Sequence, residues 1–140
     1  MATLTRRMVI AALCGMCSMV ADAAWPGGNR VRGEQVYQRC LACHALAYDR
    51  TGPRHCGLLG RRAGSVPGFA YSSAMREANL VWTRANLDAF LAAPTRYIPG
   101  TAMGYAGIAD AAERKDLIAF LAAVSQDPAR CPTGAKEARP

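Results

Sequence analysis

Lysine is nearly absent from this chain, although the chain carries a strong positive charge. Of its 17 basic residues only Lys115 and Lys136 are lysines, and the formal net charge is +7. The basic residues are scattered, without a continuous stripe or interleaved aromatic residues, so the pattern of a nucleic-acid-binding module is missing. The charge favours acidic partner proteins or transient contact with an anionic membrane surface. A general preference for arginine in the source proteome explains the composition equally well.

The sequence also lacks internal repeats, alternating strand patterns and an apolar run long enough for a comfortable membrane span. Arg6 and Arg7 precede the apolar residues 8–20, and residues 21–23 read Ala-Asp-Ala, as at a signal cleavage site. We therefore expect residues 1–23 to be a signal peptide that is removed after export to the periplasm. An uncleaved N-terminal anchor is the alternative.

The apolar periodicity of the remaining chain predicts one all-α domain over residues 24–125 and a mobile polar tail over residues 126–140. Thr83 is the expected N-cap of a helix that ends before Pro94, and Asp110 with Glu113 resembles a capping box that opens the last helix. Other helical turns are expected over residues 31–41 and 72–78, and loops over residues 50–69 and 95–108.

A five-residue motif carries the strongest chemical signal. Residues 40–44 read Cys-Leu-Ala-Cys-His, the C-x-x-C-H signature of covalent haem c attachment. Two thiols at this spacing reach the two vinyl groups of one porphyrin, and the adjacent His44 supplies a strong ligand for the iron. The motif therefore predicts one covalently bound haem c held through Cys40 and Cys43.

The cysteines outside the motif and the predicted signal peptide are Cys56 and Cys131. They are expected either to form a disulfide in an oxidising compartment or to remain free thiols, and the sequence leaves both open. A zinc site built from Cys40, Cys43, His55 and Cys56 is a weaker alternative. Two adjacent ligands such as His55 and Cys56 bind one ion only awkwardly.

A second protein ligand on the iron would decide the chemistry. An iron with both axial positions occupied by the protein shuttles electrons, whereas an iron with one vacant position binds small molecules. The methionines outside the predicted signal peptide are Met75 and Met103. Met103 lies in a turn-rich loop before the last helix, from which it could cover the face opposite His44. Taken alone, a methionine in such a loop is more often a filler of the core.

From about Val31 to Val124 the chain resembles the class I monohaem c-type cytochromes of mitochondria and bacteria. The segments that carry the resemblance are Gly33 and Tyr37, Cys40 to His44, Thr51-Gly52-Pro53, Gly57 to Arg61, Pro67 to Tyr71, Trp82, Pro94 to Met103, and Leu117 to Leu121. The resemblance implies the small cytochrome c fold, in which helices and loops wrap around one haem. It also implies that the first and last helices cross where Gly33 meets Phe120.

The resemblance also implies roles for the residues around the haem. Met103 is implied as the sixth ligand of the iron, and Pro53 as the acceptor of a hydrogen bond from the far nitrogen of His44. The residues implied to hold the propionates are Tyr71 and Trp82 through hydrogen bonds, Arg61 through its charge, and Thr101 at the other propionate.

The chain departs from the family pattern at several positions beside the haem and on its rim. Phe90 replaces a tyrosine whose hydroxyl often reaches the methionine sulfur, and Met75 replaces a buried asparagine. Arg39 keeps one charge of the usual lysine ring, whereas Thr95 and Ala102 do not. These changes affect ligand strength and the surface offered to partners.

The function implied by the resemblance is single-electron transfer in the periplasm by a monomer whose iron cycles between Fe(II) and Fe(III). Such a protein is not an enzyme, and its partners are other redox proteins. Two alternatives remain. One is a dedicated cytochrome subunit of a periplasmic dehydrogenase, and the other is a ligand-binding or peroxidatic haem protein in which Met103 is weakly held.

Overall fold

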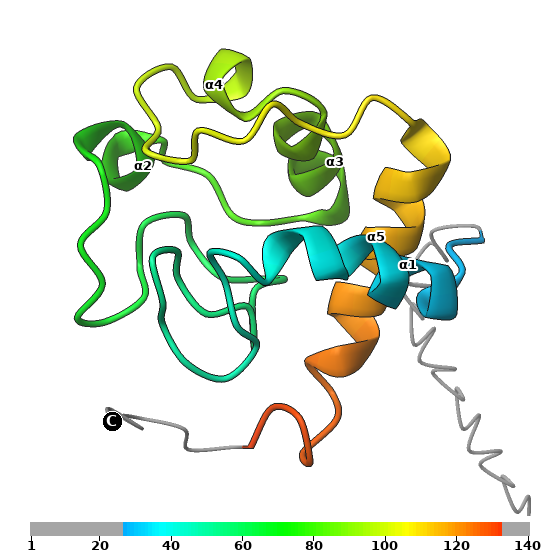
Figure 1. The fold of residues 1–140 in the computed structure, drawn as a ribbon. Coiled ribbons are helices and arrows are strands. Elements are labelled where there is room, and N and C mark those ends of the chain that lie inside the picture. The colour runs from blue at the N-terminus through cyan, green and yellow to red at the C-terminus, as the bar shows by residue number, and fades with distance from the viewer. Residues whose placement is uncertain (1–26, 133–140) are drawn as a thin grey trace, which may run out of the picture.

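Helices and long loops make up the chain in a computed structural model that describes residues 27–132 (Figure 1). The helices are α1 (Arg30–Tyr37), the 3-10 helix η1 (Gln38–Cys40), α2 (Ser73–Glu77), α3 (Arg84–Ala92), α4 (Pro94–Tyr97) and α5 (Ala111–Val124). Within residues 27–132 the only extended pairing is an isolated bridge between Arg62 and Val81. The expected all-α fold is therefore confirmed. The predicted signal peptide, residues 1–23, lies outside the described residues.

The crossing of α1 and α5 organises the molecule, and Figure 1 shows the first helix lying across the last. Gly33 sits at the crossing point. A Cβ on Gly33 would lie 2.8 Å from the Cβ of Phe120 and would overlap the backbone carbonyl of Asp116. Only a residue without a side chain lets the two helices approach this closely, so the expected contact of Gly33 with Phe120 is confirmed.

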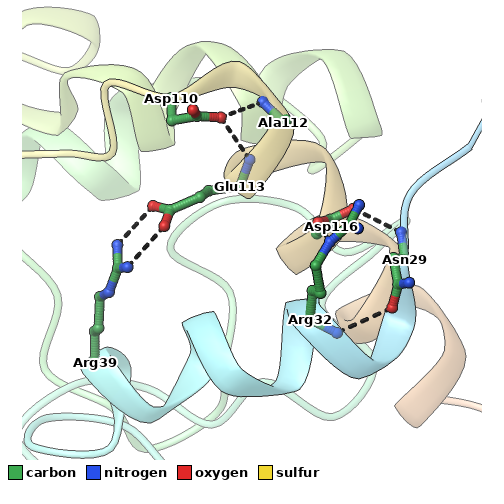
Figure 2. A network of polar contacts seen from close by, with 7 residues as sticks. All are labelled: Asn29, Arg32, Arg39, Asp110, Ala112, Glu113 and Asp116. Atoms are coloured by element: carbon green, nitrogen blue, oxygen red, sulfur yellow. Dashed lines mark hydrogen bonds and ion pairs between the residues drawn. The ribbon is translucent and has the colours of Figure 1, made fainter.

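A buried carboxylate fastens the start of α1 to α5 (Figure 2). The Asp116 side chain is only 6% exposed and accepts from the Asn29 backbone N–H at 2.6 Å and from Arg32 Nε at 2.7 Å. Hydrogen bonding to Arg32, followed by the bond from Asn29, holds the pKa of Asp116 below its ordinary value despite the opposing effect of burial. The carboxylate thus stays ionised where it joins the two helices.

Local capping signals set the starts of α3 and α5. The Asn86 N–H donates to Thr83 Oγ1 at 3.1 Å, and the N–H groups of Ala112 and Glu113 donate to Asp110 Oδ1 at 2.7 and 2.9 Å. The expected capping box is only half formed. The Glu113 carboxylate instead accepts two hydrogen bonds from the guanidinium of Arg39, at 2.7 and 2.8 Å, as Figure 2 shows.

Two segments differ from the expectations. The loop expected from residue 95 begins as the short helix α4, because Pro94 occupies the first helical position, where its missing N–H and fixed φ are tolerated. The described part of the expected mobile tail, residues 126–132, is tied down by a disulfide between Cys56 and Cys131 with a Cα–Cα distance of 5.4 Å. Cys131 is also buried, with 8% of its surface exposed.

The two long loop regions of the fold carry most of the residues singled out by their chemistry. One runs from the end of η1 to α2, and the other, yellow in Figure 1, runs from α4 to α5. Among residues 27–132 no helix is long and apolar enough to span a bilayer.

Candidate cofactor site

A largely apolar cavity of about 530 Å³ opens between the helices and the two long loops. Its volume is in the range of cavities that hold small molecules or cofactors, about 300–1,000 Å³. All the residues predicted from the sequence to bind the cofactor or the iron line it, namely Cys40, Cys43, His44, Pro53, Arg61, Tyr71, Trp82, Thr101 and Met103. The fold therefore brings together residues that are spread over more than half of the described chain.

The motif residues form a tight turn at the cavity wall. The N–H groups of Cys43 and His44 both donate to the Cys40 carbonyl, at 3.1 and 2.8 Å. Both cysteines are free, with Cys43 exposed and Cys40 partly buried. Burial raises the pKa of the Cys40 thiol to about 11, so it stays protonated at neutral pH. Two unbridged sulfurs at one edge of the cavity match the requirement for two thioether bonds.

The imidazole of His44 is held in one tautomer. Its Nδ1 lies 2.7 Å from the Pro53 carbonyl oxygen, and because a carbonyl can only accept, Nδ1 carries the proton. Nε2 is then left with a lone pair for a metal. Burial lowers the pKa of His44, against the opposing effect of the Pro53 hydrogen bond, so the neutral ring is favoured.

The chain passes close to the edge of this ring at Gly52. A Cβ at Gly52 would lie 2.6 Å from both ring nitrogens of His44 and closer still to Cε1. The Gly52 N–H donates to the Cys43 carbonyl at 2.7 Å, which fixes this approach. Any larger residue would have to displace the imidazole.

Two thioether sulfurs are available elsewhere on the cavity wall. Met103 lies in the loop between α4 and α5, where its backbone N–H donates to Thr101 Oγ1 at 3.3 Å. Met75 projects from α2 and is buried, with 8% exposed. Phe90 also lines the cavity and offers no hydroxyl to either sulfur. The wall also carries five leucines, at positions 58, 87, 91, 117 and 121.

Hydrogen-bond donors gather at another part of the wall. The Arg61 guanidinium donates to the carbonyls of Cys56 at 3.0 Å and Arg54 at 2.8 Å, and burial lowers its pKa without removing its charge. Trp82 is 6% exposed and lines the cavity. Its indole N–H is a donor that could pair with an acidic group of a bound cofactor.

These features fit a covalently attached haem. Two thiols, one neutral imidazole with a free Nε2 and two thioethers offer the required bonds to the porphyrin and to the iron. The apolar walls suit the ring. The indole donor of Trp82 and the charge of Arg61 suit the carboxylates at its edge.

His55, which the sequence indicates only as a weak zinc ligand, lies against His44 in the fold. The His55 ring stacks on His44 with centroids 4.2 Å apart and an angle of 23° between planes. Burial and the neighbouring His44 and Arg61 lower the pKa of His55 well below its ordinary value, so it is neutral. The zinc alternative is wrong, because Cys56 is bonded to Cys131. Within residues 27–132 no other cluster of His, Cys, Asp and Glu is suited to a metal ion.

Comparison with known proteins gives consistent matches. The family model described as Cytochrome c matches residues 31–125. Cytochrome c type-1 of Ascaris suum is 46% identical over 99 residues, which are 69% of this chain and 88% of that protein. Cytochrome c2 of Rhodomicrobium vannielii is 40% identical over 114 residues, which are 79% of this chain and 91% of that protein. The solved structure of cytochrome cH from Methylobacterium extorquens superimposes with a TM-score of 0.67 at 36% identity, covering 69% of this chain and 99% of that one.

Proposed function

The chain belongs to the cytochrome c family, and from this premise we propose that it is a periplasmic single-electron carrier with histidine–methionine ligation. Members of this family bind one covalently attached haem c and carry electrons. When bound, the haem supplies an iron that accepts and releases one electron. The proposal assigns Cys40 and Cys43 to the thioether bonds, and His44 and Met103 to the two axial positions.

One observation carries the proposal. The hydrogen bond from His44 Nδ1 to the Pro53 carbonyl leaves the lone pair of Nε2 unused by the protein, and His44 lies on the wall of a cavity that Cys40, Cys43 and Met103 also line. A fixed neutral imidazole is what an axial ligand requires, because a freely rotating or protonated ring would bind the iron poorly. The same bond increases the basicity of the ligating nitrogen.

The remaining residues of the site support the bound group rather than react. Arg61, Tyr71, Trp82 and Thr101 are proposed to hold the propionates, and the apolar walls exclude water from the ring. Ligation by His44 and Met103 in both oxidation states would keep structural change on electron transfer small, which would suit a carrier. In this proposal the chain turns over no substrate, and its partners are other redox proteins.

Met103 rather than Met75 is proposed as the sixth ligand. Met103 follows Thr101 in a loop whose turn is fixed by Gly100 at a φ of +87° and by the bond from the Thr101 N–H to the Ile98 carbonyl at 3.0 Å. Met75 sits on α2, where it fills the core beside the cavity. Substitution of each methionine separates the two assignments.

The test uses the purified holoprotein in three forms: unsubstituted, Met103→Ala, and the control Met75→Leu. We expect the oxidised unsubstituted protein to show the sulfur-to-iron charge-transfer band in the red. Met103→Ala should lose this band, bind carbon monoxide rapidly when reduced and have a lower reduction potential, whereas Met75→Leu should keep the band. Loss of the band in Met75→Leu alone would reassign the ligand.

Absence of the band in the unsubstituted protein would instead favour the ligand-binding or peroxidatic alternative. Isolation of the cytochrome in a stable complex with a dehydrogenase would favour the dedicated-subunit alternative, and a lone monomer on a sizing column would count against it. The intact mass of the exported protein tests haem attachment and the proposed removal of residues 1–23 together.

A further inference from the structure

The chain has two histidines, and in the fold they lie face to face. The near-parallel rings of His44 and His55, 4.2 Å apart between centroids, form a stacked pair. His55 is not the hydrogen-bond partner of His44, because Nδ1 of His44 already donates to the Pro53 carbonyl. The stack of His55 on His44 therefore requires another explanation.

His55 is itself held from several directions. Its backbone N–H is shared between the carbonyls of Ala45 and Leu46, both at 3.1 Å. Its Nδ1 lies 3.2 Å from the hydroxyl of Tyr37, whose ring meets it edge-on with centroids 5.6 Å apart and an angle of 62°. Tyr37 is 2% exposed, so the hydroxyl cannot easily turn to water. These contacts fix the plane of the His55 ring.

The loop that carries His55 is also fastened from outside by residues 125–131, which we call the C-terminal strap. The strap is joined to the loop by the Cys56–Cys131 disulfide and by the bond from the Gly57 N–H to Ser125 Oγ at 3.3 Å. Arg130 of the strap lies over the Phe120 ring, 5.1 Å from its centroid, and pairs with Glu34 of α1 at 3.0 Å. The strap therefore closes over the side of the molecule on which the two histidines stack.

We propose that His55 is a positioning residue for His44, and that the Tyr37 hydroxyl and the C-terminal strap keep it in place. This inference rests on the proposed role of His44 as a ligand. A single hydrogen bond to Pro53 leaves the imidazole free to rock about that bond. Gly52 restricts one edge of the ring, and the stacked face of His55 restricts its plane. An aliphatic side chain would fill the same space without defining a plane.

The test compares ferric holoprotein with His55→Leu, in which the stack is lost, and with the control Ile118→Val. Ile118 is fully buried in α5 and does not line the cavity, so this control perturbs the core without touching His44. The readout is the set of hyperfine-shifted haem methyl resonances in the NMR spectrum, which depends on the orientation of the axial ligand planes. We expect His55→Leu to redistribute these resonances and Ile118→Val to leave them in place.

An unchanged pattern in His55→Leu, or an equal change in Ile118→Val, overturns the inference. If His55→Leu yields no holoprotein, Tyr37→Phe decides, because it keeps both rings and removes only the hydroxyl that orients His55. A shifted pattern in Tyr37→Phe then supports the inference, and an unshifted one overturns it. The unsubstituted protein separates this result from the ligand assignment. If the spectrum of the unsubstituted protein lacks the features of histidine–methionine ligation, the proposed function is wrong, whatever the His55 variants show.

Discussion

Replacing both Cys56 and Cys131 by serine removes the one covalent link between the loop carrying His55 and the chain beyond α5. The bridged residues are 75 positions apart, and for a closed loop of that length the chain-entropy model gives about 4.5 kcal/mol of stabilisation. Measured values are usually lower, about 2–4 kcal/mol, because the reduced chain retains structure. We therefore expect the double variant to lose about 3 kcal/mol of its free energy of unfolding.

Chemical and thermal denaturation of the holoprotein measures this loss. In a domain of about 100 residues each kcal/mol lowers Tm by roughly 4–8 °C, so a fall of roughly 12–24 °C is expected. The denaturant dependence, m, should rise, because the unbridged denatured chain exposes more surface. A thiol reductant should reproduce the loss in the unsubstituted protein and leave the double variant unchanged.

Two results would refute the reasoning. A loss below about 1 kcal/mol would mean that the bridge hardly restrains the denatured chain. A large loss with an unchanged m would place its origin in lost contacts of the folded strap, because the entropic account requires a change in the denatured state. Either result would weaken the claim that the disulfide of the C-terminal strap holds the loop of His55 in place.

Three further substitutions test the contacts of α5 with α1 and η1 by denaturation. Gly33→Ala should cost about 3 kcal/mol or more, because the new methyl group meets the backbone of Asp116 and the Cβ of Phe120; a loss within measurement error would show that the crossing can open freely. Asp116 has a pKa depressed below 3.8, so its ionisation stabilises the fold above about pH 4 and ceases to do so as the pH falls through the folded pKa. The Tm gap between unsubstituted protein and Asp116→Asn should therefore narrow as the pH falls below about 4, and a gap independent of pH would contradict this. Glu113→Gln should change Tm little, because the pair with Arg39 is exposed; a salt-sensitive fall of many degrees would count against it.

The parts of the fold set by short-range chemistry could be predicted from the sequence. Thr83 and Asp110 cap helices through hydrogen bonds to residues two or three positions away, so their signals are complete within a few residues. The same locality explains two errors. The local pattern indicates Pro94 only as the end of one helix, although it also begins α4. The capping box predicts that Glu113 bonds back to the start of its own helix, but Arg39, far away in the sequence, binds its carboxylate.

The candidate site divides in the same way. The attachment motif is local, and the resemblance supplied the distant residues that line the cavity. The disulfide pairing of Cys56 depends on where the chain returns after α5, which no local pattern records. The stack of His55 on His44 depends on the path of the intervening loop, which no short sequence pattern records.

The position of the disulfide has a consequence for the order of maturation. Four described cysteines allow three sets of two bridges, and only a bridge confined to Cys56 and Cys131 leaves both motif thiols able to bond a porphyrin. In an unfolded chain the short separation of Cys40 and Cys43 makes their collision far more frequent than that of residues 75 apart. Oxidation before folding would therefore trap the wrong pair. Productive assembly therefore requires that both motif thiols be kept reduced until they bond the porphyrin, while Cys56 and Cys131 pair with each other.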